Sequence, residues 1–514
     1  MNAQLIDHAA LAPAYAVVAG AVLAFLIDLA RPGLRGTLLG VAALGPLTAG
    51  VLAVVASRSE PRDTFCSRAG ELPGGVDVGA SCSLELDRAS AVAIVVFCGL
   101  TLVVLGLSAA TVQSGDVPAG EYVFLLSCSL FGGVVLATAR DLLTLIVALE
   151  TLTLPVYALV GLRRKSVRSA EAATTFFVVS VVSTTVTLLG AGLLYALTGA
   201  VHLDRIAAAL GARDDLRDLP LTAAAVALVL VGLAFKVAAV PFHAWAPGTY
   251  DGAPVPVAAY LSTASKVGGV VALLLVTVGA LRPYLDVAGP LLAGIAVATM
   301  TVGNLVALRQ RRMVRLLAWS SVAQVGYLLA PLGAFATAAG RTDDALRAAV
   351  VGVVAYTVFY VVINVGAFGA VIAWRGVDDG GAIEDYRGLA RRSPWVGAAF
   401  VLALAGLAGL PPGLAGLFAK VSVVRALLDG SAGWLAVIVG LNAVIGLAYY
   451  ARIAALLFAA PAESPGAAPI ESQPSGARVP ALLTLAAVSV LAVLAGFAPQ
   501  LILDASRLFG DLWT

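Results

Sequence analysis

The stretch GLAFKVAAVPFHAWAPGTYDGAP, from Gly232 to Pro254, decides the fold prediction for this chain. Lys236 lies there among apolar residues, and Pro241 follows it five positions later. Proline removes a backbone donor and breaks a helix. In an apolar setting such a break is tolerated only where the backbone is buried in protein or lines a cavity. The stretch therefore predicts an interrupted helix beside an internal polar site, with His243 directly after the break.

Composition places most of the chain in a membrane. Of its 514 residues, 60% are hydrophobic and 12% are charged, with a mean hydropathy of +0.98, whereas soluble domains carry about 25% charged residues. A spanning helix needs about 20 mostly apolar residues, and we find about fourteen such segments. Barrel strands would instead alternate in runs of about ten residues. We predict an all-α polytopic membrane protein with a single membrane domain. The segments begin near Leu11, Leu34, Ala89, Tyr122, Leu142, Ala170, Leu221, Val255, Val287, Val314, Ala348, Trp395, Trp434 and Val479.

A second interrupted segment indicates an internal repeat. In GLPPGLAGLFAK, Pro411 and Pro412 interrupt an apolar run that then reaches Lys420. Two broken helices in corresponding positions of two halves are typical of ion-handling proteins built from inverted repeats. We therefore predict breaks in helices 7 and 12. The predicted parts are helices 1–3 (residues 1–120), a first repeat of helices 4–8 (121–285), a second repeat of helices 9–13 (286–460), and a loop with helix 14 (461–514).

Arginine and lysine predict the orientation, because short loops rich in them stay in the cytoplasm. The densest basic loops are Arg31–Arg35, Leu162–Arg168, Arg309–Arg315 and Arg375–Arg392. They fall on one side if the N-terminus is outside, and an even helix count then puts both termini outside. The N-terminal segment has no basic start and no small-residue cleavage site, so we expect its helix to be retained rather than removed as a signal peptide.

The four cysteines divide into two kinds. Cys98 and Cys128 stand singly in apolar segments, where small core residues are expected. Cys66 and Cys82 share the one long outward loop, Ser57–Arg88. Since that side is oxidising in the predicted topology, we expect these two to form a disulfide.

Motifs for cofactors, metals and nucleic acids are missing from the sequence. It has no P-loop, no dinucleotide-binding fingerprint, and no predicted strand to carry one. Three histidines, widely spaced, do not suffice for paired haem ligation, and no CxxC motif or zinc-ligand spacing occurs. A net charge of +2 with short basic loops gives no nucleic-acid surface. We expect no cofactor in this chain, so other subunits must carry any redox or nucleotide chemistry.

Four ionisable residues lie inside predicted helices: Glu150, Lys236, Lys266 and Lys420. Charges there are costly and rare, and they usually face a bundle interior or a water-filled cavity. Structural ion pairing is one interpretation, but one acid cannot neutralise three lysines. At least two lysines must be neutral, hydrated, or paired with a neighbouring subunit. Because desolvation disfavours the charged form of a lysine, we favour a proton relay.

These residues carry a resemblance to a known family. The motifs LETLTLPVYALVG, LLAWSSVAQVGYLL and LAGLPPGLAGLFAK, with the opening stretch continued to Lys266, resemble the proton-pumping antiporter-like membrane subunits of respiratory complex I. The resemblance runs from about Tyr122 to Arg452. It implies two inverted five-helix repeats and a polar, hydrated axis along the membrane plane.

The resemblance also implies the residue roles and the partners. Glu150, Lys236, Lys266, Lys420 and His243 match the family's relay positions, with His243 as a relay group or a cap on the broken helix. The chain is then a translocase subunit without a redox centre, coupled to quinone reduction elsewhere. FMN, iron–sulfur clusters and quinone would lie in partner subunits. M-type and K-type subunits would be its neighbours in a bacterial plasma membrane.

Within the family, two features favour the N-type branch. The M-type branch typically has glutamate where Lys420 stands, and the L-type branch has a long C-terminal extension, whereas this sequence ends at Thr514. Two positions depart from the family. Thr174 and Thr175 occupy the region where many members have a sixth-helix lysine, and Gln324 replaces a tenth-helix histidine.

The first departure leaves the proton entry route open. Water held by a cluster of hydroxyl side chains in the sixth helix is one substitute, although such hydroxyls also bond their own helix backbone. The cluster consists of Ser180, Ser183, Thr184, Thr185 and Thr187. Alternative functions are a subunit of a multisubunit cation/proton antiporter or of a membrane-bound hydrogenase, and a scaffold that pumps nothing.

Overall fold

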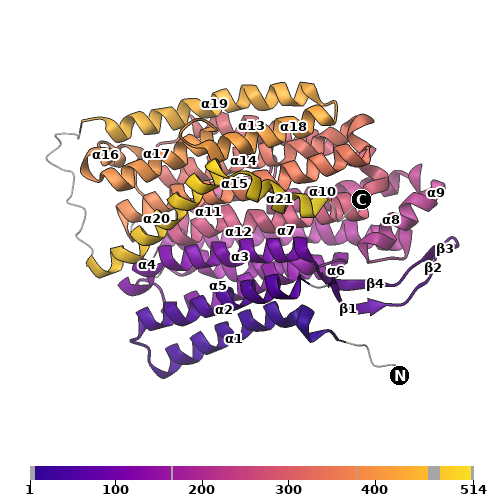
Figure 1. Cartoon of the computed structure of the whole chain (residues 1–514), viewed down its shortest axis with the longest axis horizontal. Coiled ribbons are helices and arrows are strands. Elements are labelled where there is room, and N and C mark those ends of the chain that lie inside the picture. Colours follow the sequence, from indigo (N-terminus) through magenta and orange to yellow (C-terminus); the bar gives the residue numbers. More distant parts are fainter. Residues whose placement is uncertain (1–5, 59, 164–165, 378, 461–474, 511–514) are drawn as a thin grey trace.

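The computed structural model is a bundle of nearly parallel helices with a small β-structure at one end (Figure 1). It describes residues 6–58, 60–163, 166–377, 379–460 and 475–510. Within these ranges, twelve helices are long and apolar enough to cross a membrane. The predicted all-α polytopic membrane fold is confirmed, while the count of fourteen spans, the inverted repeats and the division into parts stay predictions. The long helices are α1 (His8–Ala30), α2 (Arg35–Ala56), α3 (Arg88–Leu107), α5 (Ala119–Thr138), α6 (Leu142–Gly161), α7 (Val167–Thr198), α12 (Val255–Leu274), α13 (Leu285–Ala307), α14 (Met313–Gly333), α15 (Asp343–Arg375), α19 (Gly433–Phe458) and α20 (Ser475–Phe497).

Shorter helices complete the bundle. Two of them, α10 and α17, are apolar, and each is followed after a short gap by a second short helix, α11 or α18. The shorter α-helices are α4 (Ala109–Ser114), α8 (Leu203–Ala212), α9 (Asp214–Arg217), α10 (Pro220–Lys236), α11 (Trp245–Gly252), α16 (Leu389–Arg392), α17 (Pro394–Ala408), α18 (Leu414–Asp429) and α21 (Gln500–Gly510). A π-helical turn, η1 (Leu275–Ala280), extends α12, and 3₁₀ turns are η2 (Arg282–Tyr284), η3 (Ala334–Ala336), η4 (Ala339–Arg341) and η5 (Ile383–Tyr386).

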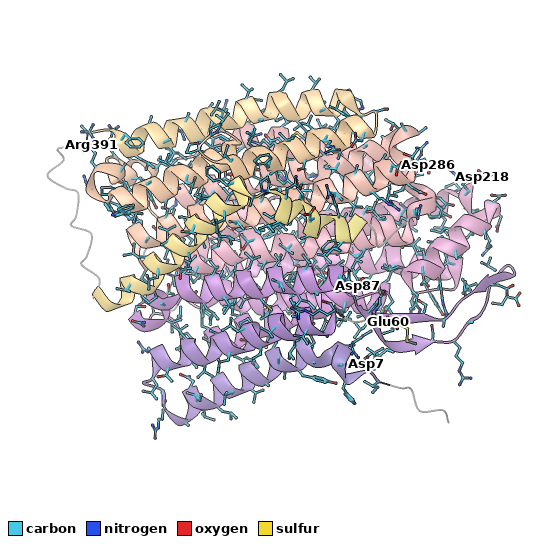
Figure 2. All side chains as sticks on the ribbon, viewed as in Figure 1. Asp7, Glu60, Asp87, Asp218, Asp286 and Arg391 are labelled. Carbon is cyan, nitrogen blue, oxygen red and sulfur yellow. A yellow bond between two sulfur atoms is a disulfide. The ribbon has the colours of Figure 1, made fainter. Side chains whose placement is uncertain are left out.

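The predicted segments match helices of the structure closely. The largest difference is five residues, between the expected start at Ala348 and the observed start of α15 at Asp343. Charged residues labelled in Figure 2, among them Asp218, Asp286 and Arg391, lie at the ends of the bundle. Charges at the ends of membrane helices are expected, because the core of a bilayer favours apolar side chains.

Both predicted helix interruptions occur in the structure. The helix α10 ends at Lys236, and α11 begins only at Trp245. Between them Ala238 has a φ of 58°, a left-handed conformation that is uncommon for a residue with a side chain. The second break separates α17 from α18 at Gly409–Gly413.

Close approach of the two half-helices at the second break depends on glycine. A Cβ atom on Gly416 would lie 1.7 Å from the carbonyl oxygen of Gly406, and one on Gly413 would lie 2.1 Å from the Gly406 nitrogen. No side chain fits at either distance. The start of α18 therefore packs directly against the backbone of α17.

The long loop after α2 contains strands, so the prediction that the chain has none is wrong. Antiparallel pairs form between β1 (Arg62–Ser67) and β4 (Ser81–Leu86), and between β2 (Gly70–Leu72) and β3 (Val76–Val78). Gly74 and Gly75, with φ values of 91° and 78°, make the tight turn between β2 and β3. Glycine is favoured where a turn needs positive φ. Gly74 and Gly75 are a sequence signal for a hairpin turn, but the long apolar segments on either side of the loop drew attention away from it.

The hairpin is held together and held to the bundle. Cys66 lies opposite Cys82 in the β1–β4 pairing, and a disulfide joins them. From α8, the Arg205 guanidinium donates hydrogen bonds to the carbonyls of Arg68 at 2.7 Å and Gly79 at 2.8 Å. We call this end of the bundle, which carries β1–β4, the hairpin end (Figure 1).

At the opposite end, a cluster of ion pairs fixes the half-helix α11. Arg312 binds Asp251 of α11 at 2.8 Å and Asp379 at 2.8 Å, and Arg168 of α7 lies 3.2 Å from Asp379. Burial by itself raises the pKa of a carboxyl group. Hydrogen bonds from Arg312 and from the Gly381 amide nevertheless hold the pKa of Asp379 below its usual value. The cluster thus connects α11 with α7 and the start of α14.

We expect the disulfide to be present in the mature protein. Mass spectrometry without reduction should show one linked peptide containing Cys66 and Cys82, with Cys98 and Cys128 alkylatable after unfolding. Finding both Cys66 and Cys82 as free thiols would contradict the assignment.

Replacing Asp379 by asparagine should lower thermal stability at pH 7, by about 1 kcal/mol because the pairs are partly exposed. A carboxyl with a lowered pKa in the folded state contributes stability above its unfolded pKa and loses it as pH falls through the folded value. The difference from wild type should therefore stay constant down to about pH 4 and then vanish. Melting curves across this range measure it, with Asp504→Asn as an exposed control. A difference that persists unchanged at lower pH would contradict the account.

Candidate functional site

A buried ion pair lies where α10 ends. Glu150 Oε1 on α6 is 2.6 Å from the Lys236 ammonium, and their side chains are 21% and 4% exposed. Two hydroxyls of α7 complete the group: Lys236 donates to Ser180 at 2.9 Å, and Thr184 donates to Glu150 at 2.5 Å. The structure thus brings together two of the predicted residues, 86 positions apart, with both charges hydrogen-bonded.

Small residues allow α7 and α10 to approach closely enough for these contacts. A Cβ atom on Gly232 would lie 2.0 Å from the Thr187 hydroxyl, and Ser183 donates a hydrogen bond to the Gly232 carbonyl at 2.9 Å. Gly232 is one helical turn before Lys236. The close contact one turn away therefore sets the distance at which Ser180 meets Lys236.

Lys266 lies in the middle of α12 and is fully buried. Its ammonium donates a hydrogen bond to the Val237 carbonyl and lies 5.7 Å from the Trp245 ring centroid, a favourable position for a cation. Val237 caps the C-terminus of α10, where the helix dipole places partial negative charge. In the described residues no carboxylate pairs with Lys266, so backbone and aromatic groups surround its charge.

Lys420, on α18, has the same kind of surroundings at the second break. Its ammonium donates to the Leu407 carbonyl at 3.1 Å and to the Ala408 carbonyl, the last residues of α17. The Tyr327 ring centroid is 5.4 Å away. Each broken helix therefore supplies free carbonyls that accept hydrogen bonds from a lysine, which is buried at the first break and partly buried at the second. Sequence reasoning had not considered the backbone as a partner for the excess lysines.

Polar side chains link α12, α14 and α15 between these two lysines. Ser262 lies one turn before Lys266, and its hydroxyl accepts a hydrogen bond from Asn364 at 2.8 Å. Tyr360 donates to the Ser262 carbonyl at 2.9 Å and shares a 2.8 Å hydrogen bond with Ser321. All four are buried. A buried, connected polar group of this kind is unusual in an apolar core, and we call it the polar path.

Gln324 belongs to a second hydrogen-bonded group, at the second break. Its amide nitrogen donates to the Leu407 carbonyl and to the Tyr450 hydroxyl, each at 3.1 Å, and Tyr356 donates to its amide oxygen. Lys420 donates to the same Leu407 carbonyl. Gln324 therefore contacts the same helix end as Lys420.

His243 lies in the turn between α10 and α11 and is half-buried. Its ring packs 5.1 Å from the ring of Trp319, and its Nδ1 is buried with no hydrogen-bond partner in the described part of the chain. No hydrogen bond recorded there joins it to Glu150 or to the three lysines. Its role as a relay group stays a prediction.

The hydroxyl cluster of the predicted sixth helix separates into two faces of α7. Ser180 and Thr184 contact the ion pair, whereas Thr185 is exposed and bonds only the Val181 carbonyl of its own helix. Thr174 and Thr175 are also exposed. Sequence reasoning missed Tyr157, whose hydroxyl donates to Ser180, and the tyrosines and asparagine of the polar path. The sequence signal that could have identified these residues is a polar side chain inside an apolar segment.

The described residues contain no group of three or more histidine, cysteine, aspartate or glutamate side chains that could hold a metal ion. In the part of the chain that the structure describes, the ion pair and the two carbonyl-bound lysines are the charged groups at the two helix breaks. Chemically, this arrangement can hold, release and pass on protons.

The fold and these charges define a helical membrane protein with ionisable groups at its helix breaks, and similarity to known proteins identifies its family. A family model described as NADH:quinone oxidoreductase/Mrp antiporter, TM, matches residues 139–446. The chain belongs to this family. The matched range includes Glu150, Lys236, Lys266 and Lys420.

Relatives with established names match over nearly the whole chain. NADH-quinone oxidoreductase subunit N of Salinispora tropica is 56% identical, over 98% of both chains. NADH-quinone oxidoreductase subunit N 2 of Streptomyces griseus is 44% identical, over 97% of this chain and 93% of the relative.

Solved structures share the fold. A chain of respiratory complex I from Thermus thermophilus superposes with a TM-score of 0.74 at 28% identity, covering 96% of this chain and 98% of that one. A chain of the Mrp complex from Dietzia sp. gives a TM-score of 0.78 at 22% identity, with 99% and 98% covered. The second shows a shared fold alone.

Removing the acid from the ion pair should destabilise the bundle. Glu150→Gln leaves the Lys236 ammonium buried without its counter-charge, and we expect a loss of about 3 kcal/mol. The double variant with Lys236→Met should recover most of that loss, since neither charge then remains. Unfolding in detergent compares both variants with wild type, and Thr185→Ala is a control on the exposed face of α7. Equal stability of Glu150→Gln and wild type would contradict a structural coupling of the pair.

Proposed function

We propose that this chain is subunit N of a bacterial NADH:quinone oxidoreductase and moves protons across the membrane. The observation that carries the proposal is the buried pair of Glu150 and Lys236 at the end of a broken helix. The names of its relatives support the assignment to subunit N. Lys420, where the M-type branch has glutamate, agrees with it.

The first step is control of the Lys236 proton by Glu150. With the carboxylate at 2.6 Å, the protonated ammonium is stabilised, because an opposite charge favours the charged form. Moving Glu150 away removes that stabilisation, and burial then favours release of the proton. Each proton moved against the membrane potential costs about 2.3 kcal/mol per 100 mV. A pKa change of two units is worth about 2.7 kcal/mol and is large enough.

The second step carries the proton along the bundle. Lys266 bonds the carbonyl of Val237, the residue directly after Lys236, so both lysines meet at the end of α10. From Lys266 the proton passes along the polar path of Ser262, Tyr360 and Ser321 to the region of Gln324, and reaches Lys420. An amide has donor and acceptor groups but does not titrate at neutral pH. Gln324 therefore orients water or hydroxyl groups on this route.

Proton entry is assigned to the hydroxyl face of α7. Ser180 and Thr184 touch the ion pair directly, and Glu150 keeps 21% of its side chain exposed. Water reaching this face supplies Lys236 without a lysine in α7. The Nδ1 of His243 has no hydrogen-bond partner among the described residues. His243 is the next polar group that the proton reaches after the helix break.

The rest of the complex provides the energy. Redox energy comes from FMN, iron–sulfur clusters and quinone in partner subunits, and M-type and K-type subunits are the neighbours. The location is the plasma membrane, with both termini and the hairpin end outside. A disulfide at that end agrees with an oxidising compartment.

The assembled complex with Lys236→Ala tests the relay. In vesicles we expect NADH oxidation and proton pumping to fall by about tenfold, which corresponds to a barrier higher by about 1.4 kcal/mol. Arg392→Gln, an exposed residue at the end opposite the hairpin, is the control. Unchanged oxidation and pumping would refute the relay. Reduced assembly with normal activity per complex would identify the chain as a scaffold.

A further inference from the structure

A groove on the surface of the bundle lies between α15, α18 and α21, and its volume is about 270 Å³. The yellow helix α21 crosses in front of α15 in Figure 1, and Gly510 of α21 packs against Val351 and Arg347 of α15. The groove has apolar walls. They are formed by Val351 of α15, by Phe418 and Val421 of α18, and by Leu503 of α21.

Three arginines from the three helices line the same groove: Arg347, Arg425 and Arg507. One carboxylate, Asp429, lines it with them, at 3.9 Å from Arg425. Arg507 pairs with Asp504 at 2.7 Å. Arg347 has no ion-pair partner among the described residues. Positive charge therefore exceeds negative charge around an apolar groove.

The groove lies at one end of its helices, which corresponds to the headgroup region of a bilayer. Asp429 is the last residue of α18, and Arg347 is in the second turn of α15. Both mark the hairpin end of their helices. The Arg425 and Arg507 side chains are 81% and 62% exposed, so their guanidinium groups reach the surface while the apolar walls continue into the membrane.

We propose that this groove binds an anionic phospholipid. The phosphate lies between the guanidinium groups, whose planar forks match phosphate oxygens, and an acyl chain lies against Val421 and Phe418. Basic pockets between membrane helices are suited to such headgroups. Free phosphate would leave the apolar walls unused. A zwitterionic lipid would bring a cation to a site that already has an excess of them.

The intact complex in nanodiscs of phosphatidylglycerol and phosphatidylcholine tests the proposal. Native mass spectrometry and lipid extraction count the phosphatidylglycerol that remains bound after detergent washing. The triple variant Arg347→Gln, Arg425→Gln, Arg507→Gln should bind it about tenfold more weakly than wild type. Ala348→Phe, which fills the groove without changing any charge, should also lose the lipid. Arg392→Gln removes one exposed arginine at the other end and should retain it.

Several outcomes would overturn the proposal. Equal retention by the triple variant and wild type would mean that the arginines do not hold lipid. Retention by Ala348→Phe with loss in the triple variant, or displacement by inorganic phosphate, would indicate a headgroup-only ligand. A cross-link from Leu503→Cys to a neighbouring subunit in lipid-depleted complex would show a protein occupant. If the triple variant does not assemble, lipid retention by Ala348→Phe tests the proposal instead, because this variant leaves every charge in place.

Discussion

The buried ion pair of Glu150 and Lys236 is the interaction around which the polar interior is arranged. Taking an ammonium out of water costs several kcal/mol, and this cost is offset here by a carboxylate at 2.6 Å and a hydroxyl at 2.9 Å. Because both partners belong to different helices, any displacement of α6 against α10 changes the balance between the charged and neutral lysine. The packing of α6 against α10 therefore affects the proton affinity of Lys236.

The two helix breaks provide hydrogen-bond acceptors for the other two lysines, Lys266 and Lys420. The ends of α10 and α17 leave carbonyl groups without intrahelical partners, and Lys266 and Lys420 donate to them. These acceptors carry partial rather than full charge, so each lysine is solvated without being fixed as half of an ion pair. A lysine held in this way can gain or lose its proton without leaving a buried carboxylate unpaired.

One contact of α11 and one of α18 hold the two breaks in place. Asp251 fixes the far end of α11 through Arg312, and Gly413 and Gly416 bring the start of α18 against α17. The irregular backbone is thus confined between rigid supports, as backbone at membrane depth must be. The groove beside α18 lies on the surface of the second broken helix, so a bound lipid would also contact this support.

Local sequence alone determined the helices, because a span needs only a long apolar run, and Pro241 and Pro411–Pro412 marked the two interruptions. Proline by itself does not decide a break, since Pro155 and Pro331 lie inside continuous helices. The sequence also singled out Glu150 and the three lysines, since any charge in such a run is exceptional. It missed the hairpin, whose strands of three to six residues are too short to stand out among long apolar segments. Only the tertiary structure decided that Ser180 and Thr184 of α7 contact the pair of Glu150 and Lys236. It also decided that backbone carbonyls receive the other two lysines and that Gln324 meets the end of α17. Those contacts depend on distances between helices, which the close packing of small residues such as Gly232 sets and which no single segment contains.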